Sequence, residues 1–240
     1  CRHGHNSLHV LTMEDHQLYK FPRTRHIYDT GGGATRDDLF MDPKEAVKFT
    51  QRHIVIEEKV DGSNLGISIT EDYQIRFQNR SHFVNASSAT QFKTLDHWVT
   101  QHPGIWQVLT SPDIVLFGEW MYAKHSIEYT RLPDYFIAFD IYIPSKNKFL
   151  SRAARETLLE GSGIASVPLL AEGTFTKEEI LAMLERPSAF YDGKVEGAYI
   201  RIENEEHEEE RGKIVRPDFM QQIETHWSTK TLVQNTVRNW

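Results

Sequence analysis

The sequence predicts an α+β fold in which antiparallel sheets are flanked by helices. Short runs of β-branched and aromatic residues recur along the chain, as buried strands require. Two of these runs, 65–70 and 74–78, are separated only by a turn, which is typical of a hairpin. Helical segments interrupt the strands, and 240 residues with 39% hydrophobic composition can bury a core of their own.

The individual elements follow from local start and stop signals. Asp42 is a candidate N-cap with Pro43 at the first helical position, which predicts a helix before the first strand. A capping box, Thr176 with Glu179 three residues later, predicts another helix. Besides the first helix, helices are predicted at 91–101, at 152–160, at 177–184 and from about residue 218, and strands at 53–58, 65–70, 74–78, 114–119, 135–143, 195–203 and 213–215.

The chain divides into a polar N-terminal arm (1–40), a main domain (41–222) and a short C-terminal tail (223–240). The arm contains His3, His5 and His9, which could bind a metal ion, but an exposed arm explains them equally well. The glycines at 31–33 lack the following Lys-Ser/Thr of a phosphate loop, so we interpret them as a connector.

The composition bounds the compartment. Cys1 is the one cysteine, which excludes an intramolecular disulfide and a cysteine-based zinc cluster and favours the reducing cytoplasm or nucleus. No apolar run approaches the roughly 18 residues that cross a bilayer, so no membrane association is expected. The chain begins at Cys rather than Met, so the sequence is compatible with a missing upstream or targeting segment.

The net charge of -7 argues against a protein that coats nucleic acid through basic residues alone. The segment 195–212 concentrates the negative charge, with seven Glu against two Arg. We interpret this acidic stretch as a solvated hairpin loop, which leaves room for a local basic groove elsewhere.

Lys59 follows a predicted strand and precedes an Asp61-Gly62 turn. A lysine acts as a nucleophile only when its amine is neutral, which needs burial or cationic neighbours. The acidic residues nearby would stabilise the charged form, so a catalytic role requires that they be directed elsewhere. The alternative is a surface strand end followed by a tight turn.

Four further motifs follow Lys59-Val60-Asp61-Gly62-Ser63-Asn64 along the chain. They are LFGEW at 116–120, FIAFDI at 136–141, VEG at 195–197 and KIVR at 213–216. In this order the five segments resemble motifs I, III, IIIa, IV and V of the covalent nucleotidyltransferases, and they look most like the RNA ligase 2 family. The resemblance spans about residues 50–220 and implies a nucleotidyltransferase fold for the main domain.

The resemblance also implies catalytic roles. Lys59 would attack the α-phosphate of ATP and carry AMP as a phosphoramidate, which splits one hard exchange into two easier ones. Lys213 would stabilise the charge that develops on phosphorus. Glu196, assisted by Asp61, would bind Mg²⁺ or Mn²⁺, since magnesium takes few carboxylates together with phosphate oxygens.

Nucleotide contacts are implied in the same way. Glu119 would bind the ribose hydroxyls and Phe139 would stack on adenine, although a Phe in an apolar strand can equally be a core residue. Arg80 suits phosphate because its guanidinium matches two oxygens, but it could also be an exposed strand-end residue. The full set of predicted nucleotide contacts is Glu58, Asn64, Arg80, Glu119, Phe139, Lys213 and Arg216.

The sequence departs from the family pattern at motif V. The position of its second lysine is occupied by Val215, so either Arg216 reaches the same phosphate or one contact is missing. Arg211 is a third candidate. Only 24 residues follow Arg216, too few for a closing OB-fold domain.

These features predict an ATP-dependent RNA ligase, expected as a monomer, that joins 5'-phosphate to 3'-hydroxyl ends. DNA ligation is an alternative, because the choice between RNA and DNA rests on 2'-hydroxyl contacts and helix geometry. A non-catalytic protein that binds nucleotide or RNA 5' ends is a second alternative, favoured by the irregular motif V.

Overall fold

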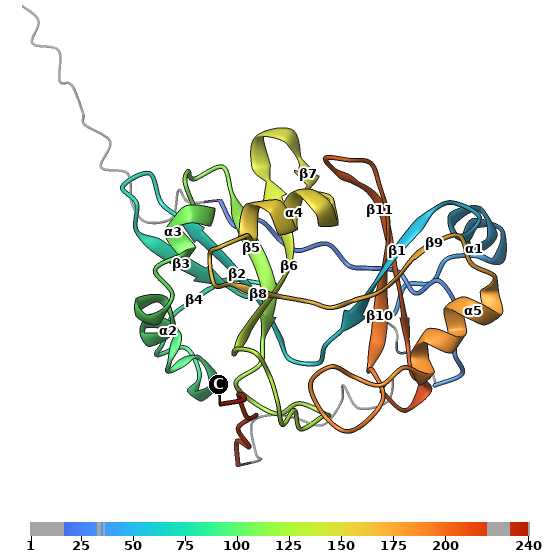
Figure 1. Ribbon diagram of the computed structural model, residues 1–240. Helices are drawn as coiled ribbons and strands as arrows, with labels where there is room; N and C mark the ends of the chain where they lie inside the picture. Colours follow the sequence, from blue (N-terminus) through green and yellow to red (C-terminus); the bar gives the residue numbers. More distant parts are fainter. Residues whose placement is uncertain (1–16, 33–34, 36, 220–230, 240) are drawn as a thin grey trace, which may run out of the picture.

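Two sheets form the scaffold of the protein (Figure 1), seen in a computed structural model that describes residues 17–32, 35, 37–219 and 231–239. The predicted α+β class with antiparallel sheets and flanking helices is confirmed. The smaller sheet lies on the right in Figure 1 and the larger one on the left. None of the helices in the described ranges is both long and apolar enough to cross a bilayer.

The smaller sheet has four antiparallel strands in the order β11-β10-β1-β9. One of its faces is apolar: Ile54 and Ile56 pack there with residues of two covering helices, such as Phe49 and Ile180. The strands are β1 (Ile54–Lys59), β9 (Leu169–Gly173), β10 (Gly197–Glu203) and β11 (Glu208–Val215), and the helices are α1 (Pro43–Thr50) and α5 (Lys177–Ala182).

The larger sheet has the order β4-β3-β2-β5-β6-β7, with β8 paired in parallel to β6. Its core packs Leu65 and Leu116 against helical residues such as Trp98 and Leu159. The strands are β2 (Ser63–Ile69), β3 (Ile75–Gln78), β4 (Phe83–Val84), β5 (Val115–Trp120), β6 (Phe136–Ile143), β7 (Lys148–Phe149) and β8 (Ala165–Ser166), and the helices are α2 (Leu95–Gln101), α3 (Ile105–Val108) and α4 (Arg152–Leu159).

The lysine motif connects the two sheets. Strand β1 alternates, so that Glu57 and Lys59 lie on the face opposite Ile54 and Ile56. After Lys59 the chain turns and enters β2 of the larger sheet. A Cβ on Gly62 in this turn would lie 2.7 Å from the Trp120 carbonyl oxygen, so only glycine permits this close approach.

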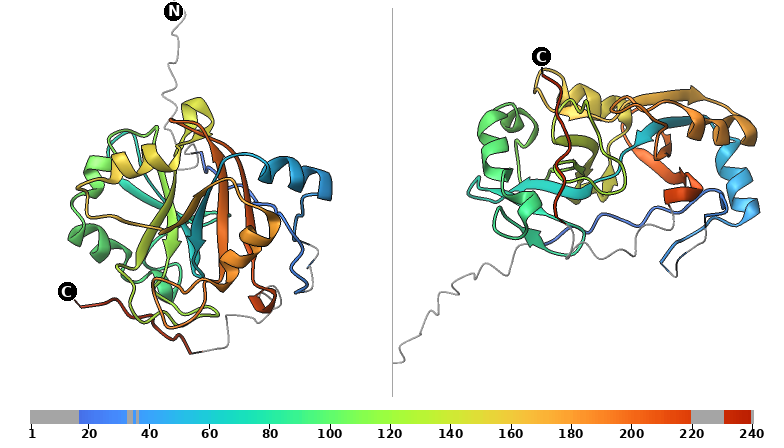
Figure 2. Two further views of the ribbon diagram at one scale, coloured as in Figure 1. Left: turned by 45° about the vertical axis from the view of Figure 1, so that its right-hand side comes forward. Right: turned by 90° about the horizontal axis from the view of Figure 1, so that it is seen from below.

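The N-terminal strap, defined as residues 17–32, runs from one sheet to the other (Figure 2, right). Phe21 is buried beside the larger sheet, and Ile27 joins the core of the smaller one. Around His26 the strap pairs with β11, because Lys213 N donates to Arg25 O at 2.9 Å and Ile27 N donates to Lys213 O at 2.8 Å. This part of the predicted polar arm therefore contributes to the folded core, whereas the arm's boundary at residue 40 stays a prediction.

The described part of the C-terminal tail, 231–239, lies against the segment after β5. Asn235 is 1% exposed; its side chain donates to Met121 O at 2.8 Å and accepts from Tyr129 N at 2.9 Å. These contacts anchor the tail to the loop between β5 and β6.

Several local predictions need correction. The predicted helix 91–101 is a 3₁₀ turn, Thr90–Phe92, followed by α2, and the short elements β4, β7, β8, β9 and α3 were missed. Further 3₁₀ turns lie at Pro144–Lys146, Met183–Glu185 and Pro217–Phe219. The helix predicted from about residue 218 lies largely outside the described residues, as do His3, His5 and His9.

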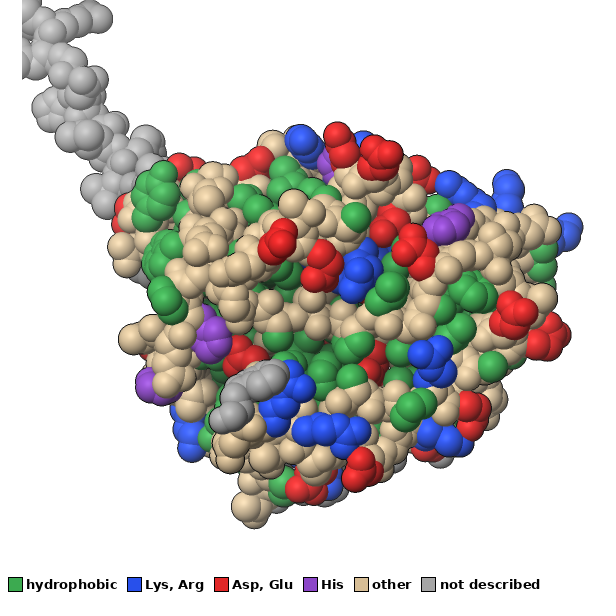
Figure 3. Space-filling view, in the orientation of Figure 1, with side chains coloured by type: hydrophobic (Ala, Val, Ile, Leu, Met, Phe, Trp, Pro, Cys, Tyr) green, Lys and Arg blue, Asp and Glu red, His purple; other side chains and the backbone are tan. Residues whose placement is uncertain are grey.

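The acidic stretch 195–212 is mostly not a solvated loop. Strands β10 and β11 pair across it, and only residues 204–207 connect them. Acidic side chains do gather at the tip of this hairpin (Figure 3), but the Glu208 carboxylate is 5% exposed and pairs with Arg201 and Arg211. The negative charge of Glu208 is thus balanced by Arg201 and Arg211, and the pattern of charges along the sequence does not show this pairing.

Candidate active site

A cavity of about 230 Å³ lies between the two sheets. It collects residues from six strands and their adjoining turns, at the place where β1 leads into β2. Eight of the ten sequence-predicted site residues line it, namely Glu58, Lys59, Asp61, Asn64, Arg80, Glu119, Phe139 and Lys213. The five motifs, up to 154 positions apart in the chain, thus meet at one site.

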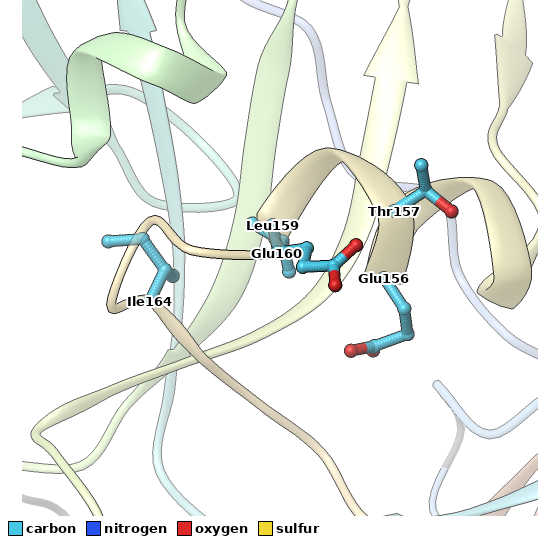
Figure 4. A pocket seen from close by; sticks show the side chains of 5 residues that line it. All are labelled: Glu156, Thr157, Leu159, Glu160 and Ile164. Carbon is cyan, nitrogen blue, oxygen red and sulfur yellow. The ribbon is translucent and has the colours of Figure 1, made fainter.

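A second depression of about 340 Å³ lies at the C-terminal half of α4 (Figure 4). Its lining residues are Glu156, Thr157, Leu159, Glu160 and Ile164. They include no cation and no aromatic ring, which are the groups that bind phosphate and a base. We therefore place the candidate active site in the smaller cavity.

Lys59 forms an ion pair with Glu196. Its Nζ lies 2.7 Å from Oε2 and 3.0 Å from Oε1 of the carboxylate, and both side chains are largely buried. Burial alone would lower the pKa of Lys59, but Glu196, with Tyr199 and Glu119, outweighs it and raises the pKa. The acids next to Lys59 in the sequence are directed elsewhere, Glu57 to buried arginines and Glu58 to Ser188, but the distant Glu196 stabilises the charged form of Lys59.

Glu119 and Asn64 face each other across β5 and β2. Glu119 Oε1 accepts a hydrogen bond from Gly62 N at 3.0 Å, and burial raises the pKa of this carboxyl to about 7. The buried Asn64 Oδ1 has no hydrogen-bonding partner among the described residues. Two acceptors with spare capacity, side by side in a cavity, suit a ligand that carries hydroxyl groups.

Lys213 lies across from them on β11. Burial, and then the nearby charge of Lys59, lower the pKa of its ammonium to about 8. The strap residue His26 pairs with Lys213 and is 3% exposed; its Nε2 lies 3.3 Å from Asp38 Oδ1, while its buried Nδ1 has no partner in the described part of the chain. Sequence reasoning missed His26, because its proximity to Lys213 depends on a parallel pairing 187 positions apart.

Phe139 and Tyr199 form an aromatic pair in the cavity. Their ring centroids are 6.2 Å apart and their planes differ by 21°. Phe139 is 4% exposed and also packs in the core, so its interpretation as a core residue is confirmed, and its stacking on adenine stays a prediction. Sequence reasoning missed Tyr199, although the strand alternation that starts at Gly197 places it on the face of β10 that Arg201 shares.

Three other predicted residues occupy less direct positions. Arg80 is exposed at the end of β3, with its guanidinium 5.8 Å from the Phe21 ring centroid. Arg216 donates its backbone N–H to Glu196 O at 3.0 Å, but its side chain stacks on Phe219 and is not part of the cavity lining. Arg211 belongs to a buried ion network with Asp140 and Glu208, which rules it out as a free phosphate ligand.

Glu58 points to the opposite side of β1 from Lys59. Its carboxylate accepts hydrogen bonds from Ser188 Oγ at 2.5 Å and from Ala189 N at 3.1 Å, and burial raises its pKa. The carboxylate therefore anchors the loop before β10. That Glu58 contacts the nucleotide stays a prediction, and its side-chain oxygens are already occupied.

The donor set fits a divalent cation that shares its ligands with phosphate. Asp61 Oδ2 accepts backbone N–H groups of Ser126 at 2.7 Å and Ile127 at 3.3 Å, which leaves Oδ1. Within the described ranges no group of three or more His, Cys, Asp or Glu could hold a metal ion by itself. Glu196 and Asp61 are two carboxylates, and magnesium is commonly bound by one or two carboxylates with substrate phosphates.

Comparison with known families gives one match along the sequence. The family model described as RNA ligase matches residues 52–215, which includes all five motifs apart from the last residue of motif V. No curated protein matches the chain.

Solved structures share the fold. Naegleria gruberi RNA ligase with PPi has a TM-score of 0.63 and 20% identity over 86% of this chain and 58% of that one. A point mutant of the same ligase with ATP and Mn has a TM-score of 0.61 and 19% identity over 83% and 56%. Another mutant, with AMP and Mn, has a TM-score of 0.62 and 20% identity over 85% and 57%. The chain thus spans less than two thirds of these ligases.

Proposed function

We propose, from the premise that this chain belongs to the RNA ligase family, that it is an ATP-dependent RNA ligase that forms a lysyl-AMP intermediate on Lys59. The observation that carries the proposal is the convergence of Lys59, Glu119 and Lys213 on one cavity, with Glu196 bound to Lys59. These groups come from both sheets, and each suits one part of a nucleoside triphosphate.

In the first step, Lys59 Nζ forms a bond to the α-phosphorus of ATP while the bond to the bridging oxygen of pyrophosphate breaks. The amine must be neutral for this attack, so the ion pair with Glu196 has to open and the proton has to leave. Lys213 stabilises the negative charge that builds up on phosphorus, provided that its ammonium keeps its proton.

The rest of the cavity orients the nucleotide. Phe139 and Tyr199 offer aromatic faces to the adenine base, and the acceptors on Glu119 and Asn64 receive hydrogen bonds from the ribose hydroxyls. Holding both ends of the adenosine places the α-phosphate next to Lys59, which removes most of the entropy cost of the reaction.

Glu196 and Asp61 would hold Mg²⁺ or Mn²⁺. Such a cation supplies positive charge that offsets the triphosphate and polarises its oxygens. Naegleria gruberi RNA ligase mutants have been solved with ATP or AMP and Mn, which supports a divalent cation in this family.

In the later steps, a 5'-phosphate of RNA takes AMP from Lys59, and a 3'-hydroxyl then displaces AMP to form the phosphodiester bond. Arg80, exposed at the mouth of the cavity, suits the incoming 5'-phosphate.

The proposal places the protein in the reducing cytoplasm or nucleus, since its single cysteine offers no partner for an intramolecular disulfide. It also takes the protein to be a monomer.

The test is adenylylation of the protein. We expect incubation with ATP and Mg²⁺ or Mn²⁺ to add one AMP, seen by intact-protein mass spectrometry, as an adduct stable to alkali and released by acid. Lys59→Ala should abolish the adduct, whereas Lys146→Ala, at an exposed lysine outside the cavity, should keep it. An unmodified wild-type mass with both metals would overturn the proposal.

Two observations favour the non-catalytic alternative: the Lys59–Glu196 ion pair and the apolar Val215 at the second motif V position. A protein of that kind would bind ATP without forming the adduct.

Parallel sealing assays on nicked RNA and nicked DNA decide whether the enzyme joins RNA or DNA.

A further inference from the structure

Phe139 sits at a β-bulge. Phe117 of β5 pairs with Asp140 and Gly118 pairs with Ala138, so the intervening Phe139 has no partner on β5. A bulge of this kind bends its strand and redirects a side chain, and bulges are over-represented next to active sites. The irregular pairing is therefore what turns the Phe139 ring toward the cavity.

Two buried arginines bind the bulge. The carbonyl oxygen of Phe139 accepts a hydrogen bond from Arg155 Nη1 at 2.5 Å and one from Arg201 Nη2 at 2.8 Å. Arg155 comes from α4 and Arg201 from β10, and the two side chains are 1% and 2% exposed. The backbone at Phe139 is thus held from two directions.

The same arginines bind β1. Arg201 Nε donates to Glu57 Oε1 at 2.6 Å, and Arg155 donates to both oxygens of this carboxylate. Glu57 is fully buried and lies two residues before Lys59, on the same face of the strand. One set of contacts therefore links the strand that carries Lys59 to the strand that carries Phe139.

Stability alone is a weak reason for this arrangement. Burying ions is costly, and well-packed apolar residues in place of a buried ion pair often leave stability unchanged or higher. A guanidinium, however, is planar and donates in fixed directions, so it fixes the geometry of the groups it joins. The distance between the base and the α-phosphate of the nucleotide is limited by its covalent structure. The site that binds the base must therefore lie at a matching distance from the Lys59 amine.

We propose that Arg155 and Arg201 are positioning residues for the adenine base, acting through the bulge at Phe139 and setting its distance from Lys59. The proposal rests on the proposed function, because it requires that Phe139 bind the base of ATP. Its specific content is that neither arginine touches the nucleotide and that both act through a backbone carbonyl.

Arg155→Met tests the proposal, with Arg152→Met as the matched control. Arg152 lies on the same helix, one turn earlier, and its Nε is 3.2 Å from Glu57 Oε2, whereas the side-chain hydrogen bonds to the Phe139 carbonyl come from Arg155 and Arg201. We expect Arg155→Met to raise the KM for ATP in the adenylylation reaction about tenfold, with kcat within about threefold of wild type, because stacking on the base is weakened. Arg152→Met should change the KM less than about twofold.

Two further readouts separate positioning from a structural role. Inorganic tripolyphosphate has no base, so its inhibition constant should be the same in Arg155→Met and wild type. In a Phe139→Leu background, Arg155→Met should add almost nothing to the rise in KM, since both changes remove the same contact with the base. Additive effects, or an equal weakening of tripolyphosphate, would contradict the proposal.

If Arg155→Met does not fold, Arg155→Lys replaces it, because a lysine keeps the charge beside Glu57 but cannot bridge the carboxylate and the carbonyl. A wild-type KM in Arg155→Lys would overturn the inference. A wild-type protein that forms no adduct defeats the proposed function instead, and calorimetric titration of ATP into the same variants then decides the inference: tenfold weaker binding in Arg155→Met supports it, and unchanged binding refutes it.

Discussion

Glu57 and Lys59 lie two residues apart on one face of β1, yet they belong to two very different charge clusters. Glu57 is part of the ion network, in which three carboxylates and three guanidinium groups, four of them in buried residues and two in partly buried ones, are joined by hydrogen bonds (Glu57, Asp140, Arg155 and Arg201; Glu208 and Arg211). Lys59 belongs to the site cluster, where Glu119 and Lys213 also line the cavity and Glu196 pairs with Lys59.

The difference shows in the acidity of the groups. Burial would raise the pKa of Glu57, but Arg201 and Arg155 outweigh it and lower the pKa to about 2. For two groups of the site cluster burial dominates instead, and the pKa values are about 7 for Glu119 and about 8 for Lys213. Two guanidinium partners keep Glu57 charged at all ordinary pH values, whereas Glu119 and Lys213 are less fully paired and change protonation near neutrality.

The largest expected effect comes from breaking the ion network. Glu57→Gln should lower the free energy of unfolding by about 3–5 kcal/mol, because two buried arginines lose a charged partner. Urea denaturation at pH 7 measures it. The control is Glu209→Gln, whose carboxylate pairs with Arg52 at the surface and should cost less than about 1 kcal/mol. Equal losses in the two variants would contradict the contrast.

The same variant makes a prediction about acid unfolding. The folded-state pKa of Glu57 lies below its ordinary value of 4.5, so its ionised form stabilises the protein above pH 4.5, and this contribution is lost as the pH falls through about 2. It amounts to about 3 kcal/mol in the wild type. Glu57→Gln should therefore show a flatter decline of stability between pH 4.5 and 2.

Lys213→Met probes the site cluster. We expect the rate of lysine adenylylation to fall about 10²-fold, as for the loss of one group that stabilises transition-state charge. The lowered pKa of Lys213 means that folding disfavours its charge, so thermal stability should stay level or rise. Lys146→Met serves as the control for both measurements. If Lys213→Met were less stable than wild type but reacted at the normal rate, this lysine would support the fold and not the reaction.

Glu119→Gln tests whether the Glu119 carboxyl changes protonation near pH 7. A carboxylate accepts hydrogen bonds from hydroxyl groups more strongly than a carboxylic acid, so wild-type affinity for ATP should rise about fivefold as the pH increases through about 7. Glutamine cannot ionise, so the variant should lose this rise. Calorimetric binding of ATP from pH 6 to 8 measures it, and an unchanged pH profile in Glu119→Gln would exclude Glu119 as the titrating group.

The smallest expected effect is at the strap. Replacing His26 by Ala opens the region beside Lys213 to water, which weakens the burial that lowers the Lys213 pKa. The alkaline limit of adenylylation should move upward by about half a pH unit. A pH–rate profile from 7 to 9.5 tests this, and an alkaline limit that does not move would show that His26 does not shield Lys213.

Several elements of the fold could be predicted from residues that lie close together in the sequence. The capping box at Thr176 and the N-cap at Asp42 start helices where expected, because both signals act within one turn. Strands β8 and β9 could not be read in this way. They are 2 and 5 residues long, and they form because longer strands, β6 and β1, offer them an edge.

The residues of the candidate site also fall into two groups, those that the sequence predicted and those that it did not. The resemblance of the motifs to those of the covalent nucleotidyltransferases predicted Lys59, Glu119 and Lys213 as site residues, and all three line the cavity. Tyr199 and His26 were missed, since their relevance comes from the partners beside them on neighbouring strands. The predicted metal ligands and the role of Arg216 stay predictions.

By itself, the sequence determined the order of the motifs and the fold class, and it predicted Lys59 as the reactive amine. Only the tertiary structure decided which acid meets which base: Glu57 meets arginines 98 and 144 residues away, while Lys59 meets a glutamate 137 residues away. The physical reason is that a pKa depends on burial and on the distance to other charges, and both are set when the two sheets come together.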